Sequence, residues 1–136
     1  MKTLTISGKY SGDLRCKLTH FKSKIELITD APTDNKGKGE AFSPTDLLAG
    51  ALGSCMLTII GIRAKSRNID IGEPAISIIK KMTNHPRKIE TIIIEITFYV
   101  QISNTNRNFL ENEARKCPVA LSLNESIKQE VSFKYA

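Results

Sequence analysis

Two of the three cysteines lie in sequence surroundings that suit thiol chemistry. Cys55 lies within a long apolar run, Leu47-Leu-Ala-Gly-Ala-Leu-Gly-Ser-Cys-Met, which predicts a helix. Cys117 follows a polar stretch and precedes a proline, in Ala114-Arg-Lys-Cys-Pro-Val. The two residues are far apart in the sequence, so only the fold can bring them together. This pattern favours a redox centre, in which the two cysteines are oxidised and reduced in turn. It favours that interpretation more than a permanent structural disulfide.

A second interpretation of each cysteine stays open. Buried cysteine often serves as an inert small apolar residue, and this applies to both Cys55 and Cys117. Cys16 lies on an alternating segment and is expected to be structural. The chain has no C-x-x-C pair, and neither His20 nor His85 is spaced with the cysteines as zinc ligands would be. The sequence also lacks the phosphate-binding, dinucleotide-binding and nucleophile-elbow motifs.

A reactive Cys55 would need help from a cation. The thiolate is the attacking form of cysteine, and apolar surroundings do not favour that charged form. Arg15, in Asp13-Leu-Arg-Cys-Lys, is the best candidate, because a planar guanidinium can stabilise a thiolate and also bind a peroxide oxygen. An acid would then hold the arginine in place. Glu40 and Asp46, near the start of the predicted cysteine helix, are the candidates for that role.

Length and composition are those of an ordinary globular protein. The chain has 136 residues, with 40% hydrophobic and 25% charged residues, which predicts a single domain over residues 1–136 with a core that needs no disulfides. No apolar span of 18 residues is apparent, so we expect no membrane segment. The first residues have no apolar signal region, which makes a cytoplasmic location the expectation.

The positive charge does not by itself indicate a nucleic-acid partner. The formal net charge is +6 and the sequence pI is near 9.3. The basic residues are scattered along the chain, and aromatic residues make up only 6% of it. Binding of single-stranded nucleic acid commonly uses aromatic residues for base stacking, and here none lie within a basic run. We therefore expect no nucleic-acid partner.

The pattern of apolar residues predicts an α+β chain. Alternation of apolar and polar residues indicates half-buried strands in the first thirty residues, which form a meander, and further strands follow in the second half. The loop 31–39 is rich in Gly, Pro, Asn and Asp. The predicted strands are 3–10, 14–20, 24–29, 75–82, 89–102 and 130–135, and the predicted helices are 43–65, 107–116 and 121–128.

The start of the first helix has a clear capping pattern. Ser43 is suited to the N-cap, Pro44 to the first helical position, and Asp46 to the positive end of the helix. Aspartate is shorter than the glutamate of the usual capping box, so the sequence alone leaves the reciprocal hydrogen bond open. The helix is apolar nearly all round, which predicts that it is a buried central helix.

The two cysteine segments together resemble those of the OsmC/Ohr family, the osmotically induced and organic hydroperoxide resistance proteins. The first segment is Phe42-Ser-Pro-Thr-Asp-Leu-Leu-Ala-Gly-Ala-Leu-Gly-Ser-Cys55-Met and the second is Ala114-Arg-Lys-Cys117-Pro-Val. The order of predicted elements is similar over nearly the whole chain. The resemblance implies an OsmC-like fold, with antiparallel sheets around a buried central cysteine helix. It also implies an intertwined homodimer with both active sites at the subunit interface.

The resemblance further implies a chemistry. Cys55 corresponds to the cysteine that attacks the peroxide and becomes a sulfenic acid, and Cys117 to the resolving cysteine that condenses with it into a disulfide. An external thiol, dithiol or lipoyl-type reductant then restores both thiols. No metal and no bound organic cofactor is implied. The expected partners are a small hydroperoxide, preferably an organic one, the thiol reductant and a second copy of the chain.

The sequence departs from the family pattern at the helix start. Studied members have a glutamate after the proline, and it binds the arginine; here Thr45 follows Pro44, and Asp46 comes one place later. One residue turns a helix by about 100°, given 3.6 residues per turn, so Glu40 is the alternative acid. Failure of the arginine and acid pair would favour a rival function, in which an OsmC-like protein binds a small hydrophobic ligand or senses redox state without efficient peroxidase activity.

Overall fold

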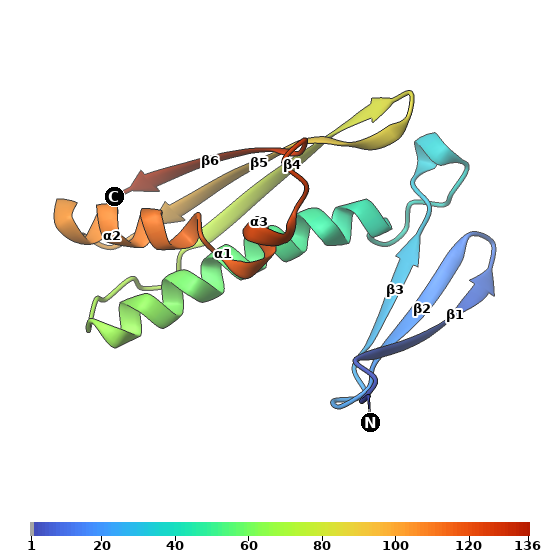
Figure 1. Cartoon of the computed structure of the whole chain (residues 1–136), viewed down its shortest axis with the longest axis horizontal. Coiled ribbons are helices and arrows are strands. Elements are labelled where there is room, and N and C mark those ends of the chain that lie inside the picture. The colour runs from blue at the N-terminus through green and yellow to red at the C-terminus, as the bar shows by residue number, and fades with distance from the viewer. Residues whose placement is uncertain (1) are drawn as a thin grey trace. The chain divides into compact units, whose positions relative to one another are not determined.

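The computed structural model describes residues 2–136, which fall into two compact units. The first unit ends at Leu47, and the second is Leu48–Ala136. The boundary falls within the first long helix, close to its start. Figure 1 shows the helices and strands of both units, coloured along the chain. The assignment of residues 1–136 to one domain stays a prediction.

The first unit contains a three-stranded antiparallel meander. Its strands are β1 (Ile6–Gly12), β2 (Arg15–His20) and β3 (Glu26–Asp30), in the order β1-β2-β3. They are the blue and pale blue arrows of Figure 1. The alternating segments of the sequence predicted this meander, with strand ends that differ by at most three residues. The turn between β1 and β2 uses positive φ at Asp13 and Leu14.

The two faces of the meander differ in character. The register places Leu18 opposite Leu27 on one face, and Arg15 opposite Asp30 on the other. Leu27 is 47% exposed on the first face, where Ile6 is 54% exposed. The alternation predicted half-buried strands, yet the apolar face has no cover within this unit. Something other than these residues must cover it if the strands are to be half-buried.

A tight loop joins the meander to the first long helix. It contains the short 3-10 helix η1 (Thr33–Asn35) and runs back along β3, where Phe42 forms a parallel bridge to Thr29. A Cβ atom at Gly37 would lie 1.7 Å from the carbonyl oxygen of Ala31, so only glycine fits there.

The helix α1 (Pro44–Ser66) begins with a closed capping box. The Asp46 amide donates to Ser43 Oγ at 3.0 Å, and the Ser43 amide donates to Asp46 Oδ2 at 3.0 Å. The first of these bonds was predicted from the sequence. The second shows that an aspartate is long enough here to complete the reciprocal pair.

The second unit is a three-stranded sheet with helices. Beyond α1 it contains, in chain order, β4 (Ala75–Asn84), β5 (Arg87–Phe98), α2 (Asn104–Ala114), α3 (Pro118–Ser122) and β6 (Lys128–Tyr135). The strand order is β4-β5-β6; β4 and β5 are antiparallel, whereas β5 and β6 are parallel. The α+β class is confirmed.

Two details of the prediction for this unit are wrong. The sheet is not purely antiparallel, because α2 and α3 form a crossover that returns the chain to β5 in the parallel sense. The short helix predicted at 121–128 lies earlier, at Pro118–Ser122. Pro118 occupies its first position, which suits a residue without an amide hydrogen, and the extended backbone at Leu123 ends it.

The core of the second unit lies between α1 and the sheet. Leu52, Met56 and Ile60 of α1 are fully buried, as are Ile92 and Ile94 of β5. Close approach explains one glycine in the helix, because a Cβ at position 53 would lie 2.5 Å from a methyl group of β4. The opposite side of α1 is open to solvent, however. Burial on every face, which the apolar pattern predicted, is not present within one chain.

The length and composition of α1 correct one expectation. It has 23 residues and a mean hydropathy of 1.7 over its most apolar window, so it is long and apolar enough to cross a membrane. The expectation that no such span exists is therefore wrong. The core helix of a soluble protein passes the same test, and one side of α1 packs into the core described above. The helix is thus weak evidence for a membrane segment.

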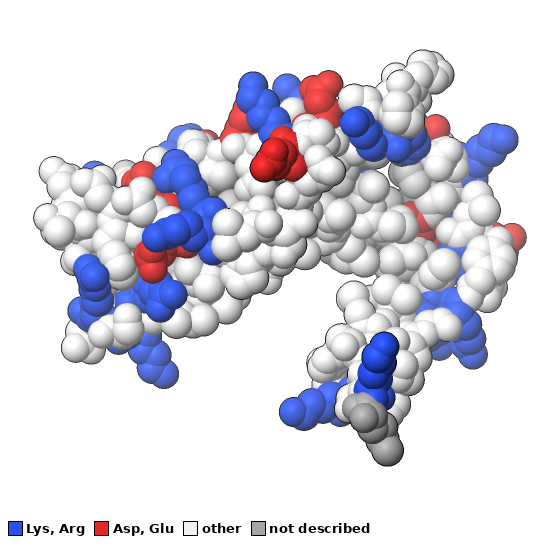
Figure 2. Space-filling view, viewed as in Figure 1, with Lys and Arg blue, Asp and Glu red and all other residues white. Residues whose placement is uncertain are grey.

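Lys and Arg are spread over the face shown in Figure 2, among acidic and uncharged residues.

Candidate active site

The buried thiol of the second unit belongs to Cys117, at the start of α3. Cys117 is the N-cap of this helix, and its Sγ accepts a hydrogen bond from the Ala120 amide at 3.4 Å. The sequence places it there because Pro118 is suited to the next position. The side chain has no solvent exposure. Its position is set by both the helix start and the surrounding core.

The second thiol, Cys55, lies next to it. Cys55 projects from α1, is partly buried against the same core, and interacts with the side chain of Cys117. Both cysteines are free thiols in this structure. The fold therefore brings together two residues that the sequence separates widely, and one of them keeps partial access to solvent.

The environment of Cys117 disfavours its charged form. Burial is the main cause that raises the pKa of the Cys117 thiol, and the neighbouring Cys55 raises it further, while the Ala120 amide acts in the opposite direction. Cys117 is consequently a neutral thiol near pH 7. The two thiols are thus unequal, since one is enclosed and protonated and the other is partly accessible.

The arginine of the first unit forms a two-pronged ion pair. Arg15 Nε lies 2.7 Å from Asp30 Oδ1, and Nη2 lies 2.9 Å from Oδ2. The two residues face each other across β2 and β3. Asp30 is only 2% exposed, whereas the Arg15 side chain is 34% exposed. A bidentate pair of this kind restricts both the position and the plane of the guanidinium.

Both members of the pair are ionised. The hydrogen bonds from Arg15 lower the pKa of Asp30 despite the opposing effect of burial. Its carboxylate also accepts from the Glu40 amide at 3.1 Å. Asp30 in turn raises the pKa of Arg15, and the charges of Glu40 and Asp13 add to that effect. The pair is therefore charged throughout the neutral range.

The structure places the two predicted acids as follows. Glu40 meets the arginine pair through its backbone amide and through charge, and Asp46 completes the capping box of α1. Sequence analysis missed Asp30, the residue that binds Arg15. The meander offered a signal, because a register that pairs Thr19 with Glu26 also pairs Arg15 with Asp30.

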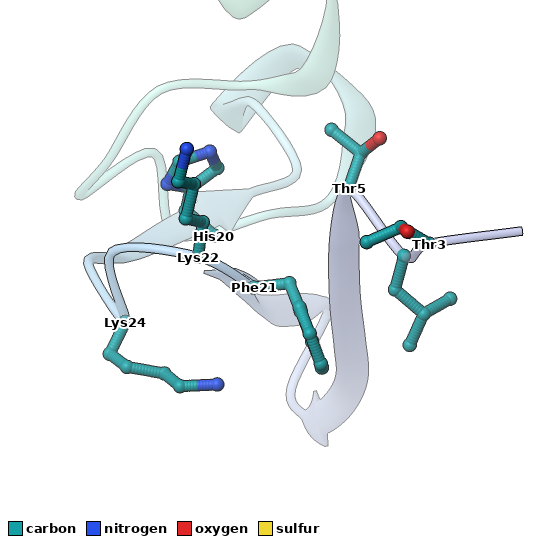
Figure 3. Close-up of a pocket in the computed structure, with 7 residues that line it drawn as sticks. Thr3, Thr5, His20, Phe21, Lys22 and Lys24 are labelled. Carbon is teal, nitrogen blue, oxygen red and sulfur yellow. The ribbon is translucent and has the colours of Figure 1, made fainter.

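A separate hollow of about 650 Å³ lies at the opposite end of β2 from Arg15. Figure 3 shows its side chains, among which Lys24 Nζ lies 4.3 Å from the centre of the Phe21 ring. It contains none of the candidate catalytic residues. Within residues 2–136, no group of three or more His, Cys, Asp or Glu side chains is placed to hold a metal ion. The lining residues of the hollow are Thr3, Leu4, Thr5, His20, Phe21, Lys22 and Lys24.

Comparison with solved structures shows close similarity over the whole chain. A protein from Psychrobacter arcticus 273-4, whose description as an osmotic stress induced and detoxification response protein is provisional, is 46% identical, with 98% of this chain and 97% of that chain covered and a TM-score of 0.94. A search of curated proteins found no match.

More distant structures share the fold. The organic hydroperoxide resistance protein OsmC of Legionella pneumophila is 16% identical over 98% of this chain and 99% of its own, with a TM-score of 0.73. An organic hydroperoxide resistance protein of Elizabethkingia anophelis is 18% identical over 100% of both chains, also with a TM-score of 0.73. The sequence itself matches the OsmC-like protein family over residues 37–132. The chain therefore belongs to the OsmC-like family.

Proposed function

We propose that the protein is a thiol-dependent peroxidase that reduces hydroperoxides. The observation that supports this best is the pair of neighbouring free thiols with unequal exposure. In the proposed cycle the Cys55 thiolate attacks the outer peroxide oxygen and the O–O bond breaks. This gives the Cys55 sulfenic acid and an alkoxide, which takes a proton from water and leaves as an alcohol. The Cys117 thiol then attacks that sulfur, so a disulfide forms and water leaves. An external dithiol is oxidised to its own disulfide and returns both cysteines to thiols.

The roles of the two cysteines follow from their surroundings. The attacking sulfur must meet a peroxide, and Cys55 is the partly accessible one. A resolving sulfur needs to meet only the sulfenic acid, so full burial is no obstacle for Cys117. Its raised pKa keeps it protonated, and the protonated thiol reacts poorly with peroxide. The apolar residues around both thiols favour organic hydroperoxides over hydrogen peroxide.

Arg15 is assigned the stabilising role for the thiolate and the peroxide. Guanidinium suits this role, because it is always charged and offers several donors in one plane. The sequence offers Glu40 or Asp46, near the start of α1, as the acid that orients it. The proposed cycle needs no bound metal or organic cofactor, only the external reductant. We place the reaction in the cytoplasm, where thiol reductants keep cysteines reduced.

The proposed activity is tested by peroxide consumption in the presence of a dithiol such as dithiothreitol. We expect the reduced protein to consume cumene hydroperoxide catalytically, with a kcat/KM higher than that for hydrogen peroxide. Removal of the dithiol should leave a single turnover. A protein that consumes neither peroxide, with its thiols unchanged, would instead favour the binding of a small hydrophobic ligand.

We also propose that the chain forms a homodimer. The apolar face of the meander contains a groove of about 330 Å³, and the outward side of α1 exposes further apolar residues. Monomeric proteins rarely leave contiguous apolar surfaces of this kind open to water. A second copy would cover both surfaces. The groove is lined by Ile6, Leu18, His20, Ser23, Ile25 and Leu27.

Two neighbouring residues of β3 give a matched test of this dimer. Leu27 lies on the groove face and is 47% exposed, whereas Ile28 lies on the other face and is 43% exposed. The Leu27→Asp variant should shift the mass from light scattering toward the 15.1 kDa of one chain, since it places a charge in the interface. The Ile28→Asp variant should remain a dimer. A monomeric parent protein, or equal behaviour of the two variants, would contradict the proposed interface.

A further inference from the structure

We propose that Asp30 is the residue that positions Arg15 for the thiol chemistry. No motif of the sequence singled out this residue, and the role rests on the peroxidase function proposed above. Asp30 lies at the end of β3, directly opposite Arg15 at the start of β2. The strand register of the meander therefore places Arg15 and Asp30 opposite each other, whatever their side-chain conformations.

The hydrogen bonds of Asp30 hold both its side chain and its backbone in place. Both carboxylate oxygens bind the guanidinium, at 2.7 and 2.9 Å, and Oδ2 also accepts from the Glu40 amide at 3.1 Å. The Asp30 amide donates to the Phe42 carbonyl at 3.0 Å, so its backbone is held as well. These hydrogen bonds and the burial of Asp30 together restrict its carboxylate to one position. The arginine that it binds is thereby restricted to one orientation.

The pair leaves part of the arginine for another ligand. A guanidinium has five N–H donors, and the two bonds to Asp30 use only two of them. The Arg15 side chain is one-third exposed while its partner is enclosed. The guanidinium can therefore meet an anionic or peroxide oxygen without first releasing Asp30. This is the arrangement that a stabilising group needs, because its orientation is set before the reaction begins.

The other acids are less suited to the same role. Glu40 contributes to Asp30 through its backbone amide, a contact that does not depend on its side chain. The Asp46 carboxylate accepts from the Ser43 amide in the capping box. Asp30 also links Arg15 to the loop that leads into α1, through Glu40 and Phe42.

The test compares Asp30→Asn with two matched variants. Asp30→Asn removes the charge but keeps the shape, and we expect kcat/KM for cumene hydroperoxide to fall roughly 10- to 100-fold, as misplacement of a catalytic group does. The pH at which half of Cys55 is alkylated by iodoacetamide should move upward. Glu26→Gln removes another ion-paired carboxylate from the same strand, where Glu26 Oε2 lies 3.5 Å from Lys17 Nζ, and should change neither value. Glu40→Gln should have a smaller effect than Asp30→Asn.

The Asp30→Glu variant distinguishes a positioning role of Asp30 from a loss of activity caused only by lower stability. It restores the charge, so it should recover part of the activity and of the alkylation profile, even if melting shows the same loss of stability as Asp30→Asn. Full activity of a folded Asp30→Asn protein, or a larger loss with Glu40→Gln, would overturn the role of Asp30. If Cys55→Ser retains the parent rate, the peroxidase function fails and this role fails with it. If Cys55→Ser is inactive while Asp30→Asn is fully active, only the role of Asp30 fails.

Discussion

Replacement of Cys55 by serine is expected to lower the rate of cumene hydroperoxide consumption by about 10³-fold or more, because removal of an attacking residue commonly has an effect of at least this size. Serine has nearly the same shape, but its hydroxyl does not ionise near pH 7 and cannot pass through a sulfenic acid. The measurement is the initial rate of peroxide loss at saturating dithiol.

Cys16 supplies the matched control for this variant. It is also a partly exposed free thiol, but it lies on β2, where it pairs with Thr29, and it is not a member of the pair formed by Cys55 and Cys117. Cys16→Ser should therefore keep the parent rate. A Cys55→Ser protein that consumes peroxide as fast as the parent would contradict the proposed cycle, and so would a strong loss caused by Cys16→Ser alone.

Replacement of Cys117 by serine should separate the first step of the cycle from the second. Serine is a preferred N-cap, so it can accept the Ala120 hydrogen bond and preserve the start of α3. The first oxidation of Cys55 should proceed at close to the parent rate. The sulfenic acid should then persist, because no neighbouring thiol condenses with it.

The outcome can be read by mass spectrometry after one equivalent of peroxide. Dimedone should label Cys55 in the Cys117→Ser protein and leave it almost unlabelled in the parent. Over repeated turnovers we expect activity to decline roughly 10-fold as Cys55 passes to the irreversible sulfinic acid. Equal labelling of the two proteins, with a stable rate in both, would show that Cys117 does not resolve the oxidised Cys55.

Much of the fold could be predicted from local patterns. Alternating residues predicted the meander, and Ser43, Pro44 and Asp46 predicted the start of α1 almost to the residue. These signals are local, since a capping box or a half-buried strand depends on a few neighbouring positions. The parallel pairing of β5 with β6 could not be read in this way, because it depends on the crossover through α2 and α3.

In the candidate site, too, local sequence patterns predicted some features, whereas others depend on packing and strand register. The surroundings of Cys55 and Cys117 identified both thiols, but their contact depends on how α1 and α3 pack, which no local pattern records. The choice of Glu40 and Asp46 followed their nearness to the helix in the sequence. Asp30 was missed because its link to Arg15 is a matter of strand register. Residues that meet across a sheet require the pairing of strands to be worked out first.

The most direct test of the central claim is a count of free thiols on the reduced protein before and after one equivalent of cumene hydroperoxide, followed by peptide mapping. The chain has three cysteines, so we expect the count to fall from three to one. The lost pair should map to a disulfide between Cys55 and Cys117, with Cys16 still free. An unchanged count, or a disulfide that includes Cys16, would contradict the account.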